Sequence, residues 1–109
     1  MASVFDLLDE IRKRPSMYLG GDDSGRILQL KNLEHLLYGY ALALGQHRVV
    51  EPIADFGREF AEYLRQTKGW RMSCGAVSAI TEEAGNDADA WELFWGLVDE
   101  FRAKVEARQ

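Results

Sequence analysis

The chain has 109 residues, of which 47% are hydrophobic and 28% are charged, with a formal net charge of −5. This length predicts one domain, residues 1–109, with a single core, and the composition excludes a disordered chain. The single cysteine excludes an intramolecular disulfide, and the lack of an apolar run near ~20 residues excludes a membrane span. The excess of acidic residues argues against non-specific nucleic-acid binding.

Apolar residues recur at helical spacing along most of the chain, which predicts four or five helices. The first helix begins at a capping-box-like Ser3-x-x-Asp6 and ends before Pro15, because the residue before a proline avoids helical dihedral angles. Three apolar residues after the proline are predicted to enter the core: Met17, Tyr18 and Leu19.

The second helix is predicted from about residue 30 to residue 44, with Gly45 as its C-cap. The segment 27–30 is so short that a helical turn and an extended piece both stay open. Gly39 interrupts this helix at a cost of about 1 kcal/mol relative to alanine. We therefore expect that another helix approaches closely at this glycine.

A third helix is predicted with Pro52 in its first turn, a position that suits proline, and with Gly69 just past its end. A shorter fourth helix is predicted over residues 73–84. The last helix has the most regular pattern and places Trp91 and Trp95 on an apolar stripe that predicts burial. No segment alternates with the two-residue period of a half-buried strand. The sequence therefore predicts an all-α protein, a compact single-domain bundle with short connections.

The segment Arg12-Lys-Arg-Pro-Ser-Met-Tyr-Leu-Gly20 resembles the opening motif of gyrase-B-type ATPase domains. The resemblance implies that Glu34 would activate the attacking water, with an Asp and then a magnesium-binding Asn on the same helix. Leu37 and Tyr38 stand at those two places; leucine accepts no hydrogen bond, and tyrosine is a poor ligand for a hard cation. The family's Asp-x-Gly-x-Gly adenine-binding segment is also missing, so we predict no ATPase and interpret Glu34 as a surface residue.

Three stretches together resemble small helical bacterial immunity-type proteins, which neutralise toxins by binding them. The stretches are the proline motif at 11–20, the leucine-rich helix at 30–40 and the Trp/Phe-rich helix at 91–101. The resemblance implies a helical fold, a stoichiometric partner such as a basic toxin domain, and no enzymatic activity.

Acidic residues gather in the second half of the chain, where the segment 82–89 contains four acids and no base. Such a patch attracts lysine and arginine side chains of a partner. Trp70 lies outside every apolar stripe and is predicted to be an exposed anchor at the interface. We therefore predict a protein-binding module whose partner-binding residues are Asp22, Asp23, Trp70, Glu82, Glu83, Asp87, Asp89 and Glu92.

Candidates for other chemistry are few. His35 and His47 have no second ligand at helical spacing and are predicted to be surface residues, so we expect no metal or other cofactor. Cys74 is predicted to be an inert packing residue.

Two alternatives stay open: a nucleotide-binding or hydrolytic remnant that uses Glu34, and a homo-oligomer that forms through segment 38–40. The N-terminus lacks the pattern of a signal peptide, so we expect a cytoplasmic protein with no membrane partner.

Overall fold

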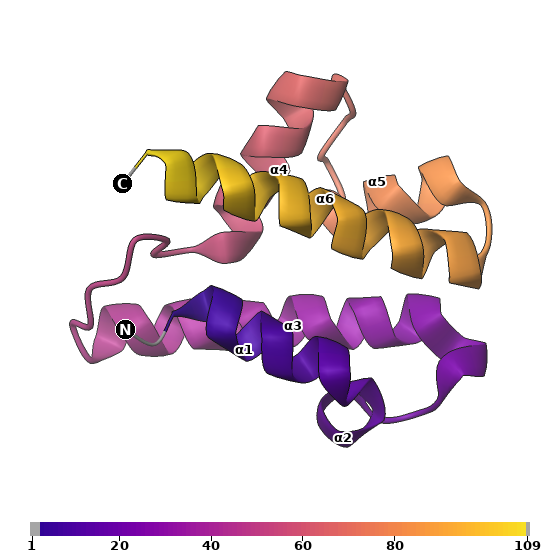
Figure 1. Ribbon diagram of the computed structural model, residues 1–109, viewed down its shortest axis with the longest axis horizontal. Helices are drawn as coiled ribbons and strands as arrows, with labels where there is room; N and C mark the ends of the chain where they lie inside the picture. The colour runs from indigo at the N-terminus through magenta and orange to yellow at the C-terminus, as the bar shows by residue number, and fades with distance from the viewer. Residues whose placement is uncertain (1–2, 109) are drawn as a thin grey trace.

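The computed structural model describes residues 3–108 and consists of six α-helices and one short 3-10 turn, η1 (Figure 1). The elements are α1 (Val4–Lys13), α2 (Pro15–Leu19), η1 (Asp23–Gly25), α3 (Arg26–Gln46), α4 (Phe56–Lys68), α5 (Gly75–Ala84) and α6 (Asp87–Ala107). No strand occurs in this part of the chain. The predicted all-α domain is confirmed, although it contains six helices instead of four or five.

The additional helix arises at the proline motif. At the start of α1 the predicted capping box is present: the Ser3 hydroxyl accepts from the N–H of Phe5, and the N–H of Ser3 donates to Asp6 at 2.8 Å. Pro15 ends α1 as expected, but it also occupies the first turn of α2. A proline suits that position because its fixed φ is helical and its missing N–H would have no partner there.

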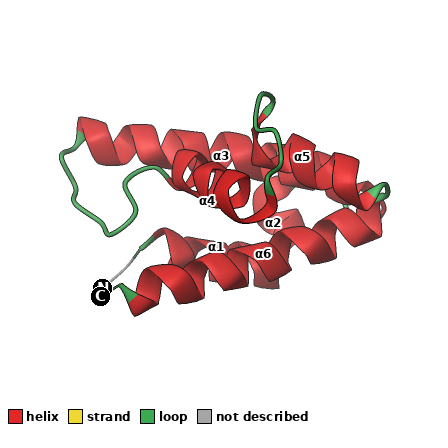
Figure 2. Ribbon diagram, turned by 90° about the horizontal axis from the view of Figure 1, so that it is seen from above, coloured by secondary structure: helices red, strands yellow, loops and turns green. Residues whose placement is uncertain are grey.

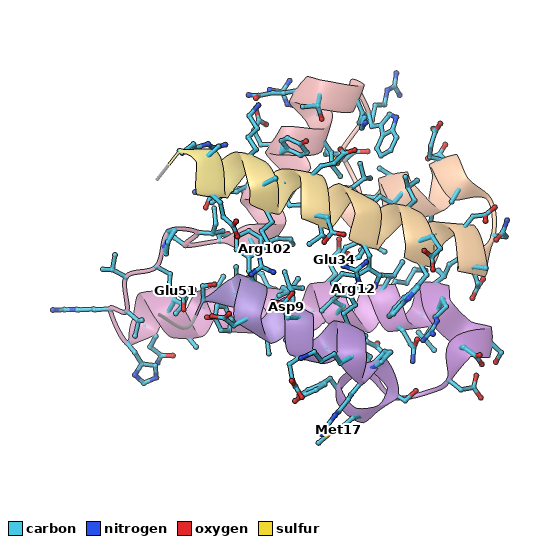
Figure 3. All side chains as sticks on the ribbon, in the orientation of Figure 1. Asp9, Arg12, Met17, Glu34, Glu51 and Arg102 are labelled. Carbon is cyan, nitrogen blue, oxygen red and sulfur yellow. The ribbon has the colours of Figure 1, made fainter. Side chains whose placement is uncertain are left out.

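The short helix α2 sends only one of its apolar side chains into the core. Leu19 is buried, whereas Met17 is 70% exposed and Tyr18 is 37% exposed. In Figure 3 the side chain of Met17 points away from the bundle. The prediction that all three residues are buried is therefore wrong for Met17 and Tyr18, because three consecutive residues of a helix cannot all face the same neighbour.

Helix α3 is longer than its sequence pattern predicts and begins at Arg26. Segment 27–30 is helical, and the N–H of Ile27 donates to the carboxylate of Asp87 on α6 at 3.2 Å. At the other end Gly45 lies inside the helix and His47 is the C-cap, so the predicted cap is two residues early. The start of α3 thus depends on a residue far away in the sequence.

The outer face of α3 has no neighbouring helix at its glycine. Gly39 is exposed, and no atom lies within 4 Å of the place where a Cβ atom would stand. The expected close approach of another helix is therefore wrong. Segment 38–40, the predicted self-association site, does not present both of its tyrosines at the surface. Tyr38 is exposed, whereas Tyr40 is half-buried and donates its hydroxyl to Glu51.

Local caps set the ends of α4 and α5. Asp55 is the N-cap of α4 and accepts from the N–H of Arg58 at 3.3 Å, so Pro52 lies in the preceding loop and not in the first turn. Aspartate is among the strongest N-cap residues, which explains why the helix starts here. Gly69 and Gly85 end α4 and α5 in the left-handed conformation, with φ of 72° and 84°.

Helix α6 supplies a large part of the core. Figure 2 shows α6 beside α1 on one side of the bundle and α3 on the other side, and in Figure 1 α6 lies above both. Trp91 and Trp95 are buried, as predicted. The buried residues of α6 are Ala90, Trp91, Phe94, Trp95, Leu97, Val98, Phe101 and Val105.

Two arginine–aspartate pairs join α1 to α6 (Figure 3). Arg102 donates from Nη1 to both carboxylate oxygens of Asp9 at 2.8 and 2.9 Å, and Arg12 contacts Asp99 in the same way at 3.0 and 3.1 Å. Exposed ion pairs each stabilise a fold by only ~0.2–1 kcal/mol. Their contribution here is to fix the position of α1 along α6.

Tyr40 makes the free energy of unfolding depend on pH in the alkaline range. Burial, together with the hydrogen bond to Glu51, raises the pKa of Tyr40 from 10.0 to about 12. The unfolded chain therefore loses this proton first, and the free energy of unfolding falls as the pH rises from about 10 towards 12. We expect a steeper fall in the unchanged protein than in Tyr40→Phe, measured by urea unfolding at a series of pH values. Equal slopes for the two proteins would contradict this assignment.

Candidate partner-binding surface

The start of α3, the end of α5 and the start of α6 lie at one end of the molecule (Figure 1), and the residues there include many acids. The turn at Gly85 and Asn86 brings the end of α5 next to the start of α6, and the contact from Ile27 to Asp87 brings the start of α3 to the same place. We call this surface the acidic end. Its acidic residues are Asp22, Asp23, Glu82, Glu83, Asp87, Asp89 and Glu92.

These acids have no ion-pair partner among the described residues. Every salt bridge of residues 3–108 uses a different acid: Asp9, Glu10, Glu62, Asp99, Glu100 and Glu106. The whole chain has a formal net charge of −5 and the seven carboxylates of the acidic end carry −7, so all other residues together carry only +2. The negative potential of the protein is therefore concentrated at this end.

Three of the seven acids also hold the local structure. Asp87 is half-buried and accepts from α3, as described above. Asp89 accepts from the side chain of Asn86 at 2.8 Å, while the Asn86 side chain caps α6 by accepting from the N–H of Asp89 at 2.9 Å. Asp22 accepts from the N–H and hydroxyl of Ser24, and these hydrogen bonds lower the pKa of Asp22. The remaining four acids have no such role and are free to meet a partner.

Residues of η1 and α6 line the same hollow, which has a volume of about 290 Å³. Asp23 and Glu92 lie in its walls beside Arg26 and Trp91. The guanidinium of Arg26 stands 4.2 Å over the Trp91 ring and donates to Gln29 at 2.8 Å. Asp23 thus shares one hollow with the later acid Glu92, whereas Asp22 lines a different hollow, formed with Gly20 and Gln29.

Gln29 holds the loop before η1 in place. It is the buried polar residue of α3, with 1% of its surface exposed, and its amide donates to the carbonyl of Gly20 at 2.8 Å. The same amide accepts from Arg26, so both ends of the side chain are used. The loop that carries Asp22 and Asp23 is therefore fixed to α3 from inside the fold.

Trp70 differs from its prediction. It is half-buried and packs against the core, so it is not an anchor that projects from the surface. The left-handed Gly69 immediately before it turns the chain back after α4. Trp70 forms one wall of a second hollow, about 200 Å³ in volume, that Glu82 and Glu83 also line.

Glu34 is not the surface residue that its sequence context indicates. It is half-buried and accepts from the N–H of Val77 at 3.3 Å, where it satisfies a free donor at the start of α5. The cavity beside it has a volume of about 20 Å³, which is room for roughly one water molecule. This cavity is too small for a nucleotide, so it gives no support to a nucleotide-binding remnant.

The remaining chemical candidates lie on the surface. His35 and His47 are exposed, as expected. Cys74 is exposed at the N-cap of α5, so the prediction that it is a packing residue is wrong. Among residues 3–108, no group of three His, Cys, Asp or Glu side chains has an arrangement that could hold a metal ion.

No helix in the described part of the chain is long and apolar enough to cross a membrane. Comparison with protein-family models, curated proteins and solved structures finds no match for this chain. A functional proposal therefore depends on the residues and geometry of the molecule itself.

Proposed function

We propose that this chain is a non-catalytic, cytoplasmic protein-binding module of the immunity type, which neutralises a bacterial toxin by stoichiometric binding. The acidic end is the main support for this proposal, because none of its seven carboxylates forms a salt bridge with the described residues. A concentrated field of this kind accelerates encounter with a basic surface and disfavours acidic partners.

The inhibitor would act by covering the basic residues with which the toxin holds its substrate. The carboxylates stand at the ends of α5 and α6 and in a loop that Gln29 fixes, so little flexibility is lost when a partner binds. If the toxin is a nuclease, the acidic end takes the place of the phosphate charges of its substrate. Inhibition would then weaken as the salt concentration rises.

Charge reversal at the four acids without a structural role tests the proposal. The partner is first captured from a lysate of the native host and purified. We then expect the reversal of Asp23, Glu82, Glu83 and Glu92 to lysine to weaken its binding at least about tenfold, or about 1.4 kcal/mol, in calorimetry. Asp87 stays unchanged because its replacement would disturb the start of α3.

The control of equal charge reverses four exposed acids outside the acidic end: Glu59, Glu62, Glu100 and Glu106. Because the last three belong to surface ion pairs worth only ~0.2–1 kcal/mol each, the fold of this variant is checked by circular dichroism. This variant has the same net charge, and we expect it to bind almost as tightly as the unchanged protein. An equal loss of affinity in both variants would mean that net charge alone matters and that the acidic end is not the binding surface.

A further inference from the structure

The three tryptophans differ in what covers their rings. Arg26 stands 4.2 Å over the ring of Trp91, and Arg12 stands 5.3 Å over the ring of Trp95. Trp70 has no cation over its ring among residues 3–108. The face of an indole ring attracts cations, and tryptophan does so most strongly of the aromatic residues. The ring of Trp70 is thus paired with no cation of the described residues, and Trp70 lines an open hollow.

The surroundings of Trp70 complement that face. The hollow of about 200 Å³ is lined by Trp70, Arg71, Ala79, Glu82 and Glu83. Both glutamates are exposed and belong to no ion pair of the described residues. With Arg71 at the same hollow, the three charges sum to one net negative charge, which a single guanidinium would neutralise.

We propose that this hollow is a socket for one arginine side chain of a basic partner protein, an inference that rests on the proposed function. The guanidinium stacks on the indole of Trp70 and donates paired hydrogen bonds to the carboxylate of Glu82 or Glu83. Trp70 therefore receives a side chain of the partner and does not insert into it.

Size and rigidity favour this occupant. The hollow is smaller than the ~300–1,000 Å³ of a pocket for a drug-sized ligand, so it suits a single side chain. Its aromatic wall is held by packing against the core. Arginine fits better than lysine, because only a planar guanidinium can stack on the ring and contact a carboxylate in a forked geometry.

The socket can be tested on the isolated protein with acetyl-argininamide as the probe. We expect the indole N–H signal of Trp70 in a ¹⁵N NMR spectrum to shift in a saturable manner, while the signals of Trp91 and Trp95 stay in place. Neutral acetyl-citrullinamide should cause a shift at least about fivefold smaller at the same concentration, because its charge is missing. Equal shifts with both probes, or no shift of Trp70, would overturn the socket.

Variants separate the socket from a general acidic attraction. We expect Glu82→Gln with Glu83→Gln to abolish the response to acetyl-argininamide, and Arg71→Ala to strengthen it by removing a competing cation. Glu59→Gln with Glu100→Gln is the matched control for charge and should respond as the unchanged protein does. A control variant that loses the response equally would contradict the proposal.

Binding to the captured partner distinguishes this inference from the proposed function. We expect Trp70→Leu to weaken that binding about tenfold, with its fold checked by circular dichroism, and Trp70→Phe to lose less. If Trp70→Leu binds normally while the four-acid reversal does not, the socket is wrong and the proposed function stands. If acetyl-argininamide binds as expected but the reversal leaves partner affinity unchanged, the proposed function fails and the arginine site remains.

Discussion

Replacing Phe101 with alanine is expected to lower the free energy of unfolding by about 3–5 kcal/mol, the typical range for a buried phenylalanine. Phe101 is 2% exposed and contacts four other rings. Its ring centroid lies 5.3 Å from that of Tyr63, 5.6 Å from Phe60, 5.7 Å from Phe56 and 6.2 Å from Phe5. Truncation would remove contacts with α1 and α4 together and leave a cavity between them.

Thermal unfolding followed by circular dichroism measures this effect. A loss of 3 kcal/mol lowers Tm by roughly 12 °C or more in a domain of about this size. Glu100→Ala, at the exposed neighbouring position, is the control and should change stability by no more than about 0.5 kcal/mol. A loss below about 2 kcal/mol in Phe101→Ala would mean that the core collapses around the missing ring, and that the ring cluster is less rigid than its geometry indicates.

Gly75→Ala is expected to destabilise the protein by about 2–3 kcal/mol, because backbone strain and the weakening of a half-buried cap act together. Gly75 has φ of 89°, a conformation that side chains with a Cβ atom rarely adopt. The added Cβ would stand 3.0 Å from Oε2 of Glu34, whose carboxylate accepts from the N–H of Val77. The carboxylate would have to shift by a few tenths of an ångström, which weakens its hydrogen bond of 3.3 Å to the N–H of Val77 in the first turn of α5.

A double-mutant cycle separates these two causes. In a Glu34→Ala background the same glycine change should cost only the backbone strain, about 1–2 kcal/mol, since no carboxylate remains to be displaced. Gly96→Ala is the matched control: Gly96 is exposed in the interior of α6 with no atom near its Cβ position. That control should stabilise the protein by roughly 0.5–1 kcal/mol. Gly75→Ala with unchanged stability would contradict the proposed contact.

Local patterns predict every helix except α2, and most of the core. Trp91, Trp95 and Phe101 repeat at helical intervals within one element, and burial of a stripe needs no knowledge of the neighbour that covers it. The pattern failed at Met17 and Tyr18, where a proline was interpreted only as a stop. Proline also starts helices, and the new helix turned both residues outward.

Contacts between distant helices could not be predicted from the sequence. The carboxylates of Glu34 and Asp87 each bind a backbone N–H of another helix, 43 and 60 residues away along the chain. Nothing in the local sequence distinguishes such a carboxylate from one that points into water. The extension of α3 to Arg26 has the same origin, because the donor of Ile27 is satisfied only when α6 is in place.

The acidic surface was predictable in part. The run from Glu82 to Asp89 is contiguous in sequence, so its charge is evident before any fold is known. Asp23 and Glu92 line one hollow only because the folded chain brings η1 near the start of α6. Trp70 was assigned to the surface because it belongs to no stripe, yet a residue in a connection is also buried when the connection packs against the core.

The distribution of core residues has a consequence for synthesis in the cell. Helix α6 follows the other five helices in the chain, yet it supplies eight buried side chains and both ion-pair contacts to α1. While α6 is still inside the ribosome, Phe5, Phe56 and Phe60 lack the ring of Phe101 that joins them. The domain therefore folds only after α6 has emerged, and its nascent chain exposes an aromatic surface that chaperones can bind.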